Sequence, residues 1–249
     1  MLIYQNTTGQ FISDVRKNVI ADIMTQAFAS RWGRAPGAQE LNSWQNSLSR
    51  MRDVIELAGL NDNYIALEYE VPYNQSRIDC LLFGSANAES DNVVLVELKQ
   101  WSSVEALPDE GNFVETYVGG GERVVPHPSQ QVKGYHNYLM TFISEFEKPP
   151  PLRLFSCAYC HNYVGAPGAG LFAPSYRELL AQFPIYRKAD AEKMADKLGN
   201  LLKHGLGKDV FNRFMRSPVR PCLKLLTVLE TVKGEVRREF SPDSSPGYP

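Results

Sequence analysis

Three short β-rich runs between residues 64 and 100 constrain the fold of this chain more than any other feature. They are YIALEYEV (64–71), SRIDCLLFG (76–84) and NVVLVELKQ (92–100), and turn-forming residues separate them. Runs of this length that are rich in Val, Ile, Leu and aromatic residues are typical of buried strands. The simplest prediction is therefore three neighbouring strands of one sheet.

Helical patterns surround these runs. Apolar residues recur at helical spacing from about residue 11 to 32 and again from 39 to 57. Further along, residues 113–125 predict a hairpin that turns at Gly119–Gly121, and residues 152–163 predict another strand. Between them, residues 129–147 predict a helix with Ser129 as its N-cap. This order predicts an α/β fold with a central mixed sheet flanked by helices.

Length and composition fit a single domain. With 249 residues, of which 43% are apolar, the chain can bury a core, and we place the domain at residues 1–238. Residues 239–249 form a tail with the composition of a disordered segment. The chain has neither an apolar run of membrane-spanning length nor a signal-like N-terminus, so we expect a cytoplasmic protein that does not enter the membrane. Its four cysteines are too unevenly placed for a disulfide framework, and we expect reduced thiols.

Charge is unevenly distributed along the chain. Residues 187–238 carry 13 Lys or Arg against 6 Asp or Glu, a net of +7, whereas residues 1–186 carry 13 against 20, a net of −7. A basic helical part of this kind could contact phosphate groups, although solvated helix faces give the same pattern. The candidates for phosphate contacts are Lys197, Lys203, Lys208, Arg213 and Arg216.

Two carboxylates and one ammonium group form the candidate site. Alternate side chains of a strand share a face, so Glu97 and Lys99 of VELK point the same way. If the preceding strand pairs with this one, Asp79 lies beside Glu97. Two carboxylates on one sheet face suit a hard cation such as Mg²⁺ or Mn²⁺, and Lys99 could hold or polarise an attacking water. Each signal is weak alone, but together they predict a metal-dependent phosphodiesterase site.

The same residues carry a family resemblance. Asp79 in the second predicted strand, Glu97-Leu98-Lys99 in the third and Gln131-Val132-Lys133-Gly134-Tyr135 on the following helix resemble the PD-(D/E)XK nuclease superfamily, in its RecB-like branch. The resemblance implies a restriction-endonuclease-like core in which Asp79 and Glu97 bind metal and Lys99 orients water. It also implies that Gln131 and Tyr135 support the site and contact nucleic acid. The implied substrate is DNA, and the implied role is DNA repair or defence against foreign DNA.

A closer resemblance covers residues 1 to about 235. SWQNSL (43–48), EYEVP (68–72), RID (77–79), VELKQW (96–101), HPSQQ (127–131) and CAYCHNY (157–163) are similar to the nuclease-like domain that precedes a P-loop ATPase in a bacterial protein family. No G-x-x-x-x-G-K-[ST] motif occurs in the chain. The chain is therefore expected to be either a standalone relative of that family, with an ATPase or helicase as a partner, or part of a longer protein.

Several charged residues near the motifs have more than one interpretation. Glu68 is the candidate for a third carboxylate of the site, Glu70 is expected on its face, and Glu56 is the alternative for its role. An exposed pair of glutamates explains Glu68 and Glu70 equally well. Arg77, two residues before Asp79, could pair with a carboxylate or bind a phosphate.

Other residues are more easily explained by packing. Cys157 and Cys160 in one strand should face opposite sides, which disfavours a zinc site. His127 could approach a phosphate near a helix N-terminus, but packing in its loop is the commoner outcome. Trp44 and Trp101 are expected in the core or in a cleft wall.

Two other functions remain open at this point. A non-catalytic module that binds nucleic acid or a protein could retain the nuclease fold, although decay would be expected to remove one of the site residues. A hydrolase of small phosphoesters would use the same chemistry in a different cleft. A homodimer would allow both strands of a duplex to be cut.

Overall fold

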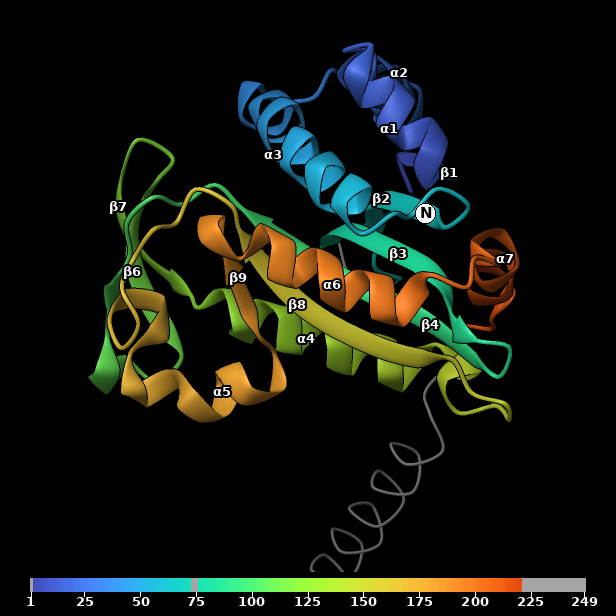
Figure 1. Ribbon diagram of the computed structural model, residues 1–249. Coiled ribbons are helices and arrows are strands. Elements are labelled where there is room, and N and C mark those ends of the chain that lie inside the picture. The colour runs from blue at the N-terminus through green and yellow to red at the C-terminus, as the bar shows by residue number, and fades with distance from the viewer. Residues whose placement is uncertain (1, 73–75, 221–249) are drawn as a thin grey trace, which may run out of the picture.

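A six-stranded mixed sheet forms the centre of the molecule (Figure 1). The computed structural model describes residues 2–72 and 76–220, and the structural statements below refer to these residues. The strand order is β1-β2-β3-β4-β8-β9. The bounds of these strands are β1 (Tyr4–Thr7), β2 (Tyr64–Glu70), β3 (Arg77–Asn87), β4 (Ser90–Lys99), β8 (Arg153–Cys160) and β9 (Ile185–Arg187).

The two halves of the sheet differ in strand direction. The pairs β1–β2, β2–β3 and β3–β4 are antiparallel, whereas β4–β8 and β8–β9 are parallel. The three predicted strands are thus neighbours, as β2, β3 and β4. The expected α/β fold with a mixed central sheet is confirmed.

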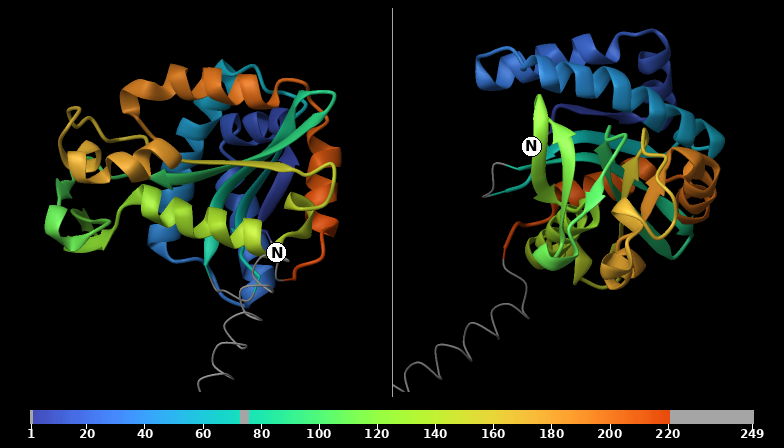
Figure 2. Two further views of the ribbon diagram at one scale, coloured as in Figure 1. Left: turned by 90° about the horizontal axis from the view of Figure 1, so that it is seen from below. Right: turned by 90° about the vertical axis from the view of Figure 1, so that its left-hand side faces the viewer.

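Helices cover both faces of the sheet. The helices are α1 (Thr8–Arg16), α2 (Ile20–Trp32), α3 (Ala38–Leu57), α4 (Pro128–Phe142), α5 (Arg177–Gln182), α6 (Ala191–Leu202) and α7 (Gly207–Arg216), with short 3₁₀ helices at Pro108–Glu110, Ser144–Phe146, Gly170–Phe172, Pro174–Tyr176 and Lys188–Asp190. One buried apolar cluster lies between the sheet and α1, α2, α3 and α6, and a second lies between the opposite face and α4, α5 and α7. Figure 2 shows α6 and α4 on opposite sides of β8. In the described part of the chain, no helix is long and apolar enough to cross a membrane.

A second, three-stranded sheet stands beside the main one. It consists of β5 (Glu105–Ala106), β6 (Phe113–Val118) and β7 (Gly121–Pro126), all antiparallel. The predicted hairpin at residues 113–125 is confirmed as β6 and β7. Gly119 and Gly120 have φ values of 61° and 87° at its turn, which favour glycine because it lacks a Cβ.

Two details of the predicted helices are wrong. Residues 11–32 form two helices because the chain reverses at Asn18, which has a φ of 56°, a value that Asn tolerates better than most residues. The cap of α4 is His127, whose Nδ1 accepts the Ser129 N–H at 3.2 Å. Pro128 occupies the first turn, where no N–H is needed, so Ser129 lies inside the helix.

Candidate active site

The main sheet splits between β3 and β4 near one end. Their pairing stops at Cys80 and Val96, although β3 begins at Arg77 and β4 continues to Lys99. On the outer sides pairing continues, because β2 pairs with β3 to Arg77 and β4 pairs with β8 to Lys99. The first residues of β3 and the last residues of β4 therefore diverge, and the predicted site residues lie where these two strands separate.

Three carboxylates occupy one row across the neighbouring strands. Asp79 and Glu97 take the facing positions immediately beyond the Cys80–Val96 pair. Glu68 faces Asp79 on the other side, between the pairs of Leu67 with Cys80 and of Tyr69 with Ile78. The structure thus brings together the carboxyl-bearing residues that the sequence singled out, two of which were predicted to be neighbours.

Glu97 is the most buried of the three, with 2% of the residue exposed. Its Oε1 accepts hydrogen bonds from Lys99 Nζ at 2.7 Å and from Gln131 Nε2 at 2.7 Å. Its Oε2 is buried and has no hydrogen-bond partner among the described residues. A buried carboxylate oxygen without a donor is costly, and a cation would compensate it.

Helix α4 supports the site through Gln131 and Tyr135. These residues lie four apart and share a helix face. Gln131 Nε2 also donates to the Tyr135 hydroxyl at 3.3 Å, so Gln131 links Tyr135 to the Glu97 carboxylate. The contact of this pair with nucleic acid stays a prediction. Trp101 also lies at the site, with its ring centroid 5.4 Å from Lys99 Nζ.

The charges at the split affect one another strongly. Burial raises the pKa of Asp79 well above its usual range, and the carboxylates of Glu97 and Glu68 raise it further. The Leu98 N–H, which has no ladder partner on β3, opposes this shift by donating to Asp79 Oδ2 at 2.8 Å. Burial lowers the pKa of Lys99, but Glu97 and Asp79 outweigh burial and raise it above its ordinary value, so Lys99 carries a positive charge.

Glu68 is held from the helix side. The Trp44 indole N–H donates to Glu68 Oε1 at 2.8 Å, and Arg77 Nε lies 3.2 Å from Glu68 Oε2. Burial raises the pKa of Glu68, while Trp44 and Arg77 oppose that rise. The φ of Glu68 is 53°, a strained value for this residue type. Arg77 therefore pairs with a carboxylate, one of the two roles expected for it.

Two residues of this network were missed or undervalued. Glu40 on α3 forms an ion pair with Arg77, and nothing in the sequence links residues this far apart. Trp44 was expected to be a core residue, and it is buried, but its N–H also binds Glu68. Gln131 and Tyr135 are four residues apart, and this helical spacing is visible in the sequence. The contacts from α3 join distant segments, so no spacing in the sequence indicates them.

The other candidates for the third carboxylate lie in ion pairs elsewhere. Glu56 lies at the end of α3, where its Oε1 is 2.6 Å from Arg16 Nη2. Glu70 pairs with Arg31 on α2. Among the alternatives, Glu68 is thus the carboxylate that adjoins Asp79.

The donor set fits a divalent cation only in part. No group of three His, Cys, Asp or Glu residues among those described is arranged to hold a metal ion. Two facing carboxylates, Asp79 and Glu97, suffice for Mg²⁺, which usually keeps several waters and takes its remaining ligands from substrate phosphates. The unpartnered Glu97 Oε2 is the atom that most favours such an ion.

Packing explains the remaining residues that the motifs brought forward. Cys157 and Cys160 are buried on opposite faces of the sheet, as the alternation of a strand predicts. His127 is fully buried and its Nε2 lies 3.1 Å from the Leu171 carbonyl oxygen. Burial lowers the pKa of His127 to about 4, so the ring is neutral near pH 7.

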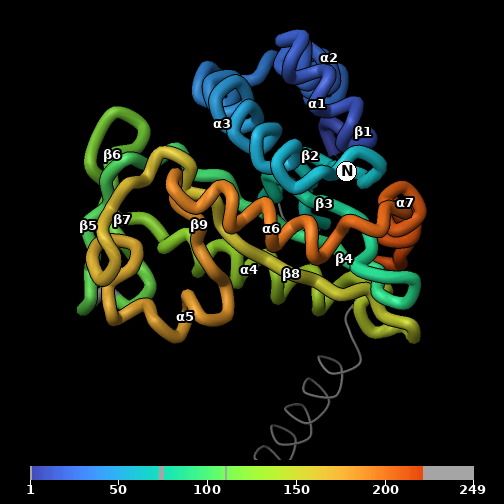
Figure 3. Tube along the Cα trace, viewed as in Figure 1, coloured from blue at the N-terminus to red at the C-terminus, as the bar shows by residue number. Residues whose placement is uncertain are grey.

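Lys208 and Arg213 are not brought to this site. Both lie on α7, and Figure 3 shows α7 and the β6–β7 hairpin at opposite ends of the molecule. Arg213 is engaged by two carboxylates, with Nη1 3.2 Å from Asp91 Oδ2 and Nε close to Glu145 Oε2. Lys208 is exposed. The rest of the predicted basic part, residues 221–238, and the predicted tail at 239–249 lie outside the described residues.

Arg213→Ala is expected to destabilise the fold by about 2 kcal/mol, less than the loss of one partner from a fully buried pair. It leaves Glu145, whose side chain is 8% exposed, with Lys148 as its remaining ionic partner among the described residues. Burial raises the pKa of Glu145, but Arg213 and Lys148 outweigh burial and lower it. Because the pKa of Glu145 is lowered in the folded state, its ion pair with Arg213 stabilises the fold above the unfolded pKa of about 4.3. This stabilisation is lost as the pH falls through the folded pKa.

Urea unfolding from pH 7 down to pH 3 measures this effect. The free-energy difference between wild type and Arg213→Ala should shrink at the acid end. Lys208→Ala, on the same helix but exposed, is the control and should unfold like wild type. Equal stability of Arg213→Ala and Lys208→Ala would contradict a structural role for Arg213.

Comparisons with protein-family models, with curated proteins and with solved structures found no match.

Proposed function

We propose that this chain is a nuclease of the PD-(D/E)XK type that hydrolyses phosphodiester bonds, with DNA as its substrate. Asp79 and Glu97 would hold Mg²⁺ or Mn²⁺. The observation that carries the proposal is the unpartnered, buried Oε2 of Glu97 beside Asp79, at the point where β3 and β4 separate. The motif order and the Gln131–Tyr135 pair on α4 support the assignment to this superfamily.

The bound cation would supply Lewis acidity, neutralise phosphate charge and lower the pKa of a bound water. The chain's own residues prepare the site for that ion. Gln131 and Lys99 fix Glu97 through Oε1, which leaves Oε2 without a donor among the described residues. The Leu98 N–H similarly fixes Asp79 through one oxygen.

Lys99 has a second task in this proposal. Its side chain is 17% exposed, so part of Lys99 reaches the surface while its ammonium group is held by Glu97. An ammonium at this place attracts the phosphate and holds the oxygen of the attacking water by hydrogen bonding. Because Lys99 is already protonated, it acts as a hydrogen-bond donor and a charge and not as the acceptor of a proton.

A hollow beside the site favours a polymeric substrate over a small phosphoester. This hollow of about 650 Å³ is lined by Gln131 and Tyr135 of the site and also by Val71, Asn112, Phe113 and Tyr138. Exposed aromatic rings next to a phosphate-cleaving centre can stack on nucleic-acid bases. The site thus has room for nucleotides on at least one side of the bond to be cut.

The experiment that tests the proposal is cleavage of end-labelled single- and double-stranded DNA and RNA with Mg²⁺, Mn²⁺ or EDTA. We expect cleavage of DNA with either metal and none with EDTA. Mg²⁺ should also raise the Tm of the wild type, because an ion that binds only the folded state stabilises it. Asp79→Asn keeps the shape of the side chain and should remove both effects.

Two outcomes would replace the proposal. Nucleic-acid binding without cleavage, unchanged by Asp79→Asn, would indicate a non-catalytic module that retains the fold. Hydrolysis of bis(p-nitrophenyl) phosphate without any cleavage of nucleic acid would indicate a hydrolase of small phosphoesters.

A further inference from the structure

Strand β8 has an open edge over half its length. Strand β9 pairs only with Ala158, Tyr159 and Cys160, whereas β8 extends from Arg153 to Cys160. Pro184 precedes β9, and α5 ends shortly before it, so no strand in the described part of the chain lies along this edge of residues 153–157. The other edge of β8 is fully paired with β4.

The open edge leaves main-chain groups without strand partners. Ala158 N–H points toward β9, because it donates to the Pro184 carbonyl oxygen at 3.0 Å. The direction of main-chain groups alternates along a strand, so the N–H and C=O groups of Leu154 and Ser156 point to the same side as those of Ala158. Neither residue pairs with another strand on that side among the described residues. Such an edge is a template for an added strand.

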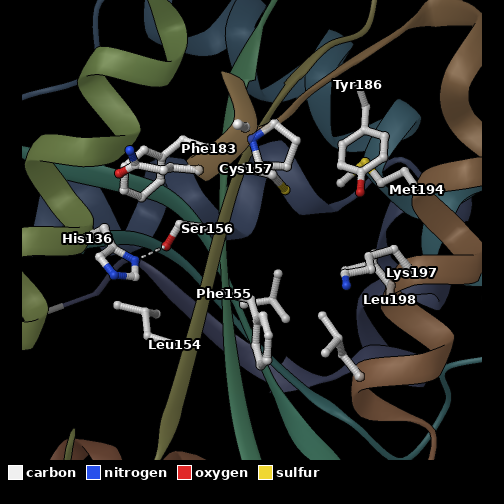
Figure 4. A pocket seen from close by; sticks show the side chains of 15 residues that line it. His136, Leu154, Phe155, Ser156, Cys157, Phe183, Tyr186, Met194, Lys197 and Leu198 are labelled. Carbon is white, nitrogen blue, oxygen red and sulfur yellow. Dashed lines mark hydrogen bonds between the residues drawn. The ribbon is translucent and has the colours of Figure 1, made fainter. Parts of the chain in front are cut away.

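A groove surrounds this edge (Figure 4). Its cavity of about 270 Å³ extends past β8 on both sides of the sheet. On one side lie His136 and Phe183, and on the other lie Tyr186, Met194 and Leu198. The walls on both sides are largely apolar, which suits a strand whose successive side chains point to opposite faces.

Two basic residues stand beside the groove without acidic partners. Lys197 lines it from α6 and lies over the Phe155 ring, with Nζ 5.8 Å from the centroid. Arg153 is exposed at the start of β8. Within the described part of the chain, neither forms an ion pair. An acidic residue in the bound segment would complement both charges.

We propose that this groove binds an extended, acidic-apolar peptide segment of another protein, which adds to β8 as a strand beside Arg153–Cys157. Main-chain hydrogen bonds to Leu154 and Ser156 give the segment its position, and the alternating pockets select its side chains. An acidic residue on the α6 side pairs with Lys197. This inference does not depend on the proposed nuclease activity.

The open edge of β8 and the two basic side chains beside it favour a peptide over a small apolar ligand. A small ligand could fill the apolar walls but would leave the N–H and C=O groups of the edge unsatisfied. It would also make no use of Lys197 and Arg153. A peptide strand satisfies both requirements.

The test uses a randomised nine-residue peptide library displayed on phage and panned on wild-type protein. We expect enrichment of sequences that alternate apolar residues and carry Asp or Glu. The best synthetic peptide should protect the Leu154 and Ser156 amides from hydrogen exchange. Leu154→Pro removes one outward N–H without touching the β4 ladder, since proline is tolerated at a strand edge. It should weaken binding about five- to tenfold relative to Leu154→Ala.

Charge reversal provides an independent arm. Lys197→Glu should weaken binding of the acidic peptide. It should strengthen binding of the same peptide with Lys in place of its acidic residue. Leu154→Pro and Lys197→Glu are both compared with wild type by circular dichroism and urea unfolding to verify that they are folded. Failure of the library to enrich any sequence, or binding that is the same in Leu154→Pro and Leu154→Ala, would overturn the proposal. If the protein instead dimerises with increasing concentration and dimerisation protects the same amides, the segment in the groove belongs to a second copy of this chain and not to another protein.

Discussion

Lys99→Ala is expected to slow metal-dependent DNA cleavage about a thousandfold, the effect typical of losing one charged donor at a reacting phosphate or oxyanion. The substitution removes the only cation that contacts Glu97 among the described residues. Single-turnover cleavage at saturating Mg²⁺ measures the chemical step. Lys99→Arg keeps the charge but not the position of the donor, and we expect it to recover only part of the rate.

Folding must be separated from chemistry in this experiment. Lys99→Ala leaves a buried carboxylate with Gln131 as its remaining donor, so a lower Tm is expected as well. Cleavage is therefore compared well below the Tm of each variant, and Lys208→Ala serves as the control because Lys208 is exposed on α7. A folded Lys99→Ala protein that cuts DNA at the wild-type rate would exclude Lys99 from the reaction.

Gly207→Ala is expected to reduce the free energy of unfolding by about 3 kcal/mol, at the upper end of the usual cost of overpacking. A methyl group at this position would lie 2.3 Å from the Tyr64 backbone nitrogen and 2.6 Å from the Asn63 carbonyl carbon. These are backbone atoms of β2 and its approach, which cannot move aside as a side chain can. The clash would lift the start of α7 away from the sheet.

The matched control is Gly134→Ala on α4, where nothing lies within 4 Å of the added methyl group. Because alanine favours a helix more than glycine does, this variant should be more stable by up to about 1 kcal/mol. Urea unfolding at pH 7 measures both variants. Similar stabilities of the two would show that α7 tolerates displacement.

The strand region was predictable because its signals are local. The runs that became β2, β3 and β4 combine length, apolar content and turn residues, and consecutive strands usually pair. Alternation within β4 placed Glu97 and Lys99 on one face, and antiparallel pairing then placed Asp79 opposite Glu97. The expectation for Gln131 and Tyr135 came from the family resemblance and from helical spacing. The comparisons added no relative that would support or oppose that resemblance.

The rest of the site depends on contacts that no local pattern encodes. Arg77 meets Glu40, and Trp44 meets Glu68, only because α3 packs across the end of β2. The positive φ of Glu68 interrupts the alternation of β2, since Leu67 and Tyr69 lie in apolar clusters on opposite faces of the sheet although they are two residues apart. The cap of α4 was missed because histidine is a rare N-cap, while serine is a common one.

The split between β3 and β4 has a mechanical consequence. Asp79 belongs to the antiparallel half of the sheet and Glu97 to the parallel half, and their strands share no ladder hydrogen bonds beyond Cys80 and Val96. A cation held by both carboxylates would join the two diverging strand ends, which the hydrogen bond from the Leu98 N–H to Asp79 already links. The affinity for the ion would depend on the distance between these strand ends. A conformational change that moves β2 and β3 away from β4 would therefore weaken ion binding even though both carboxylates are retained.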